Sequence, residues 1–160
     1  MRFLWYNLPN RAGDFFMNIS TIRQMVETDL KMDSTALDLE SLRIPQLHNK
    51  YLNIFHDQRL ILKKMKLDFK ELNRIKWEYY TGKIDQDTLD EMGWEPFPLK
   101  ILKTDIDRYL DSDSDVSKEK SKIDYQEEKV SYLESVLKNI NNIQWNIKNA
   151  IEWRKFINGT

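Results

Sequence analysis

The sequence predicts an all-α protein with two long helices and a few short ones, arranged as a helical-hairpin or coiled-coil-like protomer. Apolar residues recur at alternating steps of four and three over about residues 46–80 and again over about residues 116–157. This is the spacing of a coiled-coil seam. The second stretch contains neither proline nor glycine, so no residue in it is expected to break a helix.

The length and composition of the chain limit its class. With 160 residues, it is predicted to form a single helical domain over residues 17–160. The chain has no cysteine, which excludes disulfides and thiolate metal sites and fits a reducing compartment. It has no apolar run long enough for a membrane span, and its first residues lack the features of a signal peptide.

Short elements are expected before the first long helix. Ile22, Met25 and Val26 lie on one face of a predicted helix, and Ser20 is its expected N-cap. The D-S-T sequence at 33–35 begins a second piece, which Pro45 is expected to interrupt.

The first long helix is predicted over about residues 46–80. Gly82 follows it and suits the left-handed position that often ends a helix. Residues 83–98 contain Gly93 and two prolines and are expected to form a loop. A short helix is expected over about 99–111, and the D-S-D-S-D run at 111–115 is expected to cap the last helix.

The last helix is predicted over about residues 116–157 with a broad apolar face. Each long helix would extend about 50–60 Å, so we expect that two such helices and a few short pieces cannot close a compact core within one chain. Broad heptad faces then favour association with further copies. The residues expected to mediate this contact are Val130, Leu133, Leu137, Ile140, Ile147 and Ile151.

Charge is distributed unevenly along the chain. Residues 59–83 contain eight basic and three acidic residues, a net charge of +5, whereas residues 84–128 contain six basic and fourteen acidic residues, a net charge of −8. Five cations fall within an arc of about 80° and about 20 Å of helix, opposite the apolar seam. They are Arg59, Lys63, Lys66, Lys70 and Arg74, here called the basic stripe. It is either a surface for a polyanion such as a nucleic-acid backbone or a solvated helix face.

Residues near the end of this helix add to the candidate surface. Lys83 follows the helix, and Tyr80 is expected to be available for stacking on a base. Lys76 lies on the flank of the seam, so a regular helix does not direct it the same way as Arg74.

Catalytic signatures are absent from the sequence. It has no G-x-x-x-x-G-K-[ST] loop and no G-x-G-x-x-G sequence, so nucleotide hydrolysis and dinucleotide chemistry lack their motifs. Asp105, Asp107 and Asp111 leave open a metal-dependent nuclease, against the simpler interpretation of a solvated acidic face. We expect no enzyme activity, metal or cofactor.

Four segments carry a resemblance to a known family. They are D-S-T at 33–35, Arg74-Ile75-Lys76, Y-Y-T-G at 79–82 and I-K-N-A-I-E-W-R-K-F-I-N-G at 147–159. Their order and spacing resemble UvsY, the recombination mediator family of T-even-like bacteriophages, over about residues 17–160.

The resemblance implies a non-enzymatic, all-helical protein of the host cytoplasm that forms a ring-like homo-oligomer of roughly six or seven subunits. Such proteins bind single-stranded DNA and help a RecA-like phage recombinase displace the phage single-strand-binding protein. The basic pair before the Y-Y-x-G turn, here Arg74 and Lys76, is implied in DNA contact, and the C-terminal helix in oligomer formation.

Two segments differ from the family pattern. The family begins near Met17, so residues 1–16 are expected to be a disordered extension or the product of a misassigned start. The G-W-E-P-F-P loop at 93–98 is unlike the family's, so no partner contact is transferred to residues 83–104. The rival hypothesis is a coiled-coil phage assembly or scaffold protein that does not bind DNA.

Overall fold

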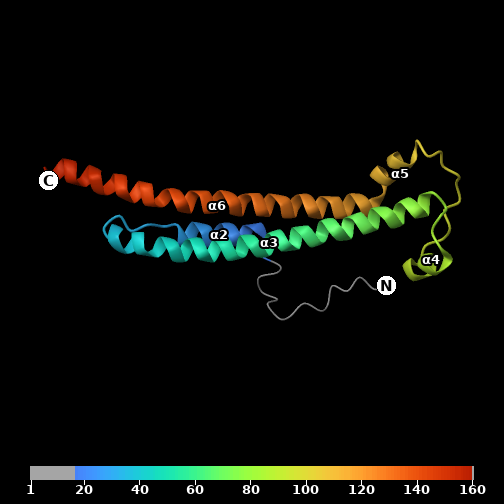
Figure 1. Ribbon diagram of the computed structural model, residues 1–160, viewed down its shortest axis with the longest axis horizontal. Coiled ribbons are helices and arrows are strands. Elements are labelled where there is room, and N and C mark those ends of the chain that lie inside the picture. The colour runs from blue at the N-terminus through green and yellow to red at the C-terminus, as the bar shows by residue number, and fades with distance from the viewer. Residues whose placement is uncertain (1–16, 160) are drawn as a thin grey trace. The chain divides into compact units, whose positions relative to one another are not determined.

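Residues 17–159 are described by a computed structural model, and helices are the only regular elements in that range. The helices are α2 (Ile19–Asp29), α3 (Leu37–Tyr80), α4 (Gln86–Met92), α5 (Ile106–Ser112) and α6 (Ser114–Asn158) (Figure 1). The predicted all-α class with two long helices is therefore confirmed. None of these helices has the length and apolar character to cross a membrane. The prediction for residues 1–16 lies outside the described residues.

The chain divides into two compact units, which are described separately. Unit 1 contains residues 61–127, and unit 2 contains residues 17–60 together with residues 128–159. Helices α3 and α6 each contribute residues to both units. The single domain expected over residues 17–160 stays a prediction.

Unit 2 has an apolar core formed by three helices. Ile22 and Tyr51 from α2 and α3, and Leu133 and Ile140 from α6, are fully buried within it. The expectation that the chain closes no core of its own is therefore wrong. The short helix α2 supplies a third apolar face, and three faces enclose a core that two helices leave open.

Local sequence explains how α2 begins. The Asn18 side chain accepts a hydrogen bond from the backbone N–H of Thr21 at 2.8 Å, which satisfies a donor left free at the helix start. Asn18, not the expected Ser20, is therefore the N-cap.

Helix α3 begins at Leu37 and not near residue 46, and Pro45 lies inside it. The expected interruption at Pro45 is therefore wrong. Proline removes one backbone hydrogen bond from a helix. Pro45 and Ser41, whose carbonyl loses that bond, are both exposed, so water can replace the missing donor while neighbouring Ile44 and Leu47 anchor the helix in the core.

In unit 1, α3 stops where the sequence predicts. Gly82 has φ +67°, and the N–H groups of Lys83 and Ile84 both donate to the carbonyl of Glu78. Left-handed backbone of this kind costs free energy for any residue with a Cβ atom. The C-terminal stop at Gly82 is confirmed.

The segment expected to be a loop, 83–98, contains helix α4. Asp85 caps its start by accepting from the N–H of Thr88 at 2.8 Å, and Gly93 ends it at φ +65°. These two caps define a seven-residue helix whose buried face is a single residue, Leu89. The short helix expected over about 99–111 is α5, which begins later, at Ile106.

The loop after α4 is held by a cluster of aromatic rings. Tyr79 lies 5.1 Å from Trp94 and 5.5 Å from Phe97, centroid to centroid. Tyr80 lies 5.0 Å from Phe97 and 5.7 Å from Tyr109 of α5. Tilted and edge-to-face pairs at these distances are favourable, so the ring pair at the end of α3 organises both the loop and α5.

Candidate nucleic-acid interface

All five cations of the basic stripe are exposed on α3. Arg59 belongs to unit 2, and Lys63, Lys66, Lys70 and Arg74 belong to unit 1. Because a helix turns by about 100° per residue, the four cations in unit 1 project from one side of α3. The buried residues of α3 in unit 1, such as Ile75, lie on another side.

Two of these cations have acidic partners at the surface. Lys66 Nζ lies 2.5 Å from Glu127 Oε1, and Arg74 Nη1 lies 2.7 Å from Glu78 Oε1. Exposed pairs of this kind contribute little free energy, so a phosphate can replace either carboxylate at low cost. Lys63 and Lys70 form no ion pair or hydrogen bond with another described residue.

Lys76 has a different environment from its neighbour Arg74. Its side chain is 7% exposed, and its Nζ lies 2.9 Å from Asp113 Oδ2 and 2.7 Å from Asp115 Oδ2. The Trp94 ring covers the ammonium, with the ring centroid 4.2 Å from Nζ. A phosphate reaches Lys76 only after these contacts open, so a DNA contact through Lys76 remains a prediction that the described contacts do not favour.

Asp113 joins two elements of unit 1, α3 and α6, through its two carboxylate oxygens. Oδ1 accepts from the N–H groups of Asp115 and Val116 and so caps α6, which places the cap where the D-S-D-S-D run predicts it. Oδ2 accepts from the Tyr80 hydroxyl at 2.7 Å and from Lys76. Burial of this carboxylate opposes its ionisation, but the hydrogen bonds from Tyr80, Lys76 and Val116 outweigh burial and lower the pKa of Asp113.

Because the pKa of Asp113 is lower in the folded state, its contribution to stability depends on pH. The contribution is fully present above the ordinary value of 3.8 and is lost as the pH falls through the lower folded value. We expect Asp113→Asn to reduce the free energy of unfolding at pH 7 by about 1–3 kcal/mol and to reduce the difference between pH 7 and pH 3. Urea unfolding at both pH values measures this, with Asp87→Asn on α4 as the control. An unchanged pH dependence would contradict the assignment.

Tyr80 is not the most accessible ring near the stripe. Its hydroxyl binds Asp113, and burial next to that carboxylate raises the pKa of Tyr80. Trp77 is 38% exposed, and at about 100° per residue it falls within about 20° of Lys66 and Lys70 on α3. Lys83 Nζ lies 4.6 Å from the centroid of the Trp77 ring, so Lys83 and Trp77 form an exposed cation–aromatic pair beside Arg74.

The residues expected to mediate self-association occupy two environments. Leu133, Leu137, Ile140 and Ile147 are buried in the core of unit 2 by contacts within the chain. Val130 is partly buried, and Ile151 is 38% exposed. The heptad pattern on α6 therefore serves mainly packing within the chain, and an intermolecular role for the six residues stays a prediction.

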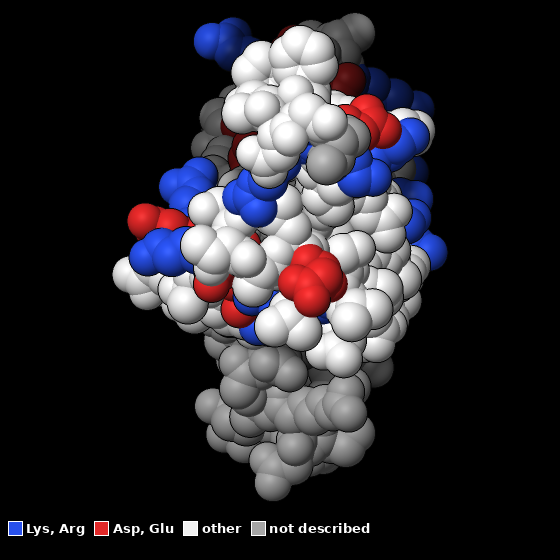
Figure 2. Space-filling model, turned by 90° about the vertical axis from the view of Figure 1, so that its left-hand side faces the viewer, with Lys and Arg blue, Asp and Glu red and all other residues white. Residues whose placement is uncertain are grey.

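The last turns of α6 carry large apolar side chains at the surface. Trp153 is 62% exposed and stacks on Phe156, which is 76% exposed. Ile157 and, near the start of α3, Leu42 are also exposed. Figure 2 looks toward this end of unit 2, where much of the visible surface carries no charged side chain. Exposed apolar surface of this kind often marks a protein contact.

The acidic residues of the nuclease alternative do not form a metal site. Over residues 17–159, no three carboxylate or imidazole side chains gather closely enough to hold a metal ion. Asp105 and Asp107 lie at the exposed start of α5.

Sequence reasoning did not predict two features of this region. The ion pair of Lys76 with Asp113 joins residues that are 37 positions apart, and no local pattern gives such a pairing. The position of Trp77 on the stripe, in contrast, follows from the same 100° rule that identified the five cations, so the sequence contained that signal.

Comparison with known protein families gives a match over most of the chain. Residues 25–160 match the family described as "Recombination, repair and ssDNA binding protein UvsY". No curated protein matches the chain significantly in sequence.

Solved structures share the fold. Two crystal structures of the bacteriophage T4 recombination mediator protein UvsY superpose with a TM-score of 0.77 each. The lattice type IV structure is 21% identical and covers 88% of this chain and 99% of that chain. The lattice type II structure is 22% identical and covers 88% and 97%. Since the family match covers most of the sequence, this chain belongs to the UvsY family of recombination, repair and single-stranded-DNA-binding proteins.

Proposed function

We propose that this chain binds single-stranded DNA along the basic stripe of α3 and acts as a recombination mediator. In this role it helps load a RecA-like recombinase onto DNA covered by a single-strand-binding protein. The observation that carries the proposal is the exposure of the four stripe cations of unit 1 on one side of α3. Neutralising several phosphates releases their counterions, which drives binding and makes it depend on salt.

A homo-oligomer would increase the affinity of a modest site. Several stripes presented to one strand act at a high effective concentration, so their combined affinity exceeds that of one stripe. The exposed apolar side chains at the end of α6, Ile151, Trp153, Phe156 and Ile157, support self-association. We propose a ring of roughly six or seven subunits, which sedimentation equilibrium over a range of protein concentrations would test.

Loading by this mechanism requires no nucleotide hydrolysis. A strand held at several phosphates is presented in a bent or wrapped form, from which the single-strand-binding protein leaves and onto which the recombinase assembles. Binding energy alone stabilises that intermediate, in keeping with the absence of a P-loop in the sequence. The chain acts in this proposal as a binding protein and not as an enzyme.

Fluorescence anisotropy of a labelled single-stranded oligonucleotide across a salt series tests the DNA-binding proposal. We expect tight binding at low salt and a linear decrease of log K with the logarithm of the salt concentration. If the oligomeric protein does not bind at low salt, the proposal fails and the scaffold hypothesis takes its place.

Trp77 is expected to stack on a base beside the stripe. Stacking on an aromatic side chain contributes about 1–3 kcal/mol per base, so we expect Trp77→Ala to weaken oligonucleotide binding by that amount. The same variant should bind an abasic oligonucleotide of equal length as the wild type does, because only phosphate contacts remain.

Trp145→Ala is the matched control. Trp145 is 64% exposed, and the centroid of its ring lies 5.5 Å from Lys148 Nζ in a similar cation–aromatic pair on α6. We expect Trp145→Ala to leave both affinities unchanged. Equal weakening of both ligands by Trp77→Ala would show that Trp77 contacts no base.

A further inference from the structure

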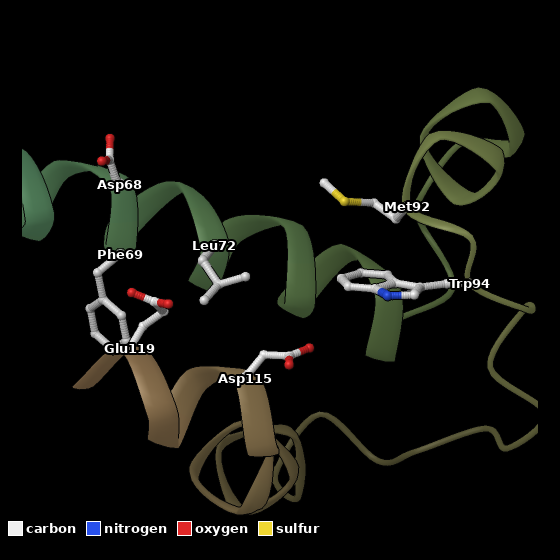
Figure 3. Close-up of a pocket in the computed structure, with 7 residues that line it drawn as sticks. All are labelled: Asp68, Phe69, Leu72, Met92, Trp94, Asp115 and Glu119. Atoms are coloured by element: carbon white, nitrogen blue, oxygen red, sulfur yellow. The ribbon is translucent and has the colours of Figure 1, made fainter. Parts of the chain in front are cut away.

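A small pocket in unit 1 lies away from the exposed stripe. Four apolar or aromatic side chains and three carboxylates line its volume of about 260 Å³. Asp115 and Glu119 extend into it from α6, and Met92 and Trp94 from the end of α4 and the loop that follows (Figure 3). The lining residues are Asp68, Phe69, Leu72, Met92, Trp94, Asp115 and Glu119.

This lining selects one kind of chemical group. The pocket combines apolar surface with carboxylates and has no lysine or arginine in its lining, so a phosphate or another anion would be repelled. A lysine or arginine side chain suits both parts, because its aliphatic stem packs on apolar surface while its charged head binds a carboxylate.

Asp68 is the lining carboxylate that the described residues leave unpaired, and its side chain points away from Asp115 and Glu119 (Figure 3). Asp115 binds Lys76 at 2.7 Å, and Glu119 has an exposed partner one turn away, Lys122, in a pair that contributes little. Asp68 is only partly exposed and has no ion pair or hydrogen bond with another described residue. It occupies a position in the apolar seam of α3, where a carboxylate beside apolar groups gains stability from a cation.

The size of the pocket indicates a side chain as its occupant. Small-molecule sites usually measure about 300–1,000 Å³, and this pocket is smaller. The three carboxylates of its lining also favour a basic partner, because complementary charge promotes encounter.

We propose that this pocket receives an arginine or lysine side chain, next to an apolar residue, from a basic segment of a partner protein. The choice of a partner over a second copy rests on the proposed function. In that function DNA occupies the chain's own basic stripe, so the stripe cannot also fill the pocket of a neighbouring copy.

A labelled peptide tests the pocket. The probe is a fluorescein-labelled peptide of alternating arginine and leucine, measured by anisotropy at low salt. We expect Asp68→Asn/Glu119→Gln to weaken its binding at least tenfold. The control Asp87→Asn/Asp124→Asn removes two exposed carboxylates of unit 1 outside the pocket and should change the affinity less than twofold. A peptide of alternating arginine and glycine should bind the wild type more weakly, since it has no apolar side chain.

Each contrary outcome has a distinct meaning. Equal weakening by both double variants, or equal binding of both peptides, would overturn the pocket in favour of general charge attraction. A change in oligomer mass with peptide affinity retained would assign the pocket to a second copy. Single-stranded DNA binding, measured on the same samples, separates the two proposals. Pocket-specific peptide binding without DNA binding overturns only the proposed function, and the reverse result overturns only the pocket.

Discussion

Replacing Lys76 with alanine is expected to lower the free energy of unfolding by about 3 kcal/mol. Breaking a buried ion pair by removing one partner usually costs about 3–5 kcal/mol, because the remaining charge is buried without compensation. The side chains of Lys76 and Asp113 are 7% and 6% exposed. The lower end of the range applies because Asp113 keeps its hydrogen bonds from Tyr80 and from the start of α6. Urea unfolding followed by circular dichroism measures the loss.

Arg74→Ala is the matched control for Lys76→Ala. Arg74 lies two residues away on the same helix, its side chain is 59% exposed and its pair with Glu78 is at the surface, so its removal should cost less than about 1 kcal/mol. The double variant Lys76→Met/Asp113→Asn should recover part of the stability, since removing both charges avoids the unpaired one. Equal stability of the two alanine variants would show that the Lys76 pair does not hold unit 1 together.

This result also bears on the basic-x-basic step before the Y-Y-T-G turn. The two cations face different surroundings, because Arg74 is exposed and Lys76 is enclosed by Trp94 and two carboxylates. A loss of DNA affinity in Arg74→Ala therefore reports a lost contact directly. A similar loss in Lys76→Ala reports a contact only if the variant remains folded, so the unfolding measurement must come first.

The sequence predicted those features of the fold that depend on local pattern. Heptad spacing gave both long helices, Gly82 gave the end of α3, and the D-S-D-S-D run gave the cap of α6. The predicted interruption at Pro45 is wrong because the effect of a proline depends on whether water reaches the carbonyl that loses its hydrogen-bond donor. Whether that carbonyl is exposed is a tertiary property that the local sequence does not give. Helix α4 was missed although Asp85 and Gly93 mark both of its ends.

The partners of each surface could not be predicted in the same way. An apolar heptad face shows that a helix packs on something, but it does not show whether the partner is α2 of the same chain or another copy. The burial of Leu133 and Ile140 inside unit 2 could therefore be established only from the fold. Lys76 shows the same limit for charge, because its carboxylate partners lie on α6 and at the residue that caps it.

Removing three stripe cations together, Lys63→Ala/Lys70→Ala/Arg74→Ala, is expected to weaken binding of single-stranded DNA on the order of a hundredfold at low salt. Each cation that contacts a phosphate contributes about 0.7 to the slope of log K against log salt for single strands, so the slope should fall by about 2.1 per engaged subunit. All three side chains are exposed, so the fold should remain intact. Anisotropy across a salt series measures both quantities.

The control for this prediction is Lys100→Ala/Lys103→Ala/Lys118→Ala. These three lysines are also exposed, and they lie in the acidic segment of unit 1, so the control changes the net charge by the same amount. If DNA follows the stripe, the control keeps the wild-type slope, because phosphates are neutralised by local contacts and not by the total charge. Equal losses in the two triple variants would instead mean that DNA responds to net charge, and the stripe would then be a solvated helix face.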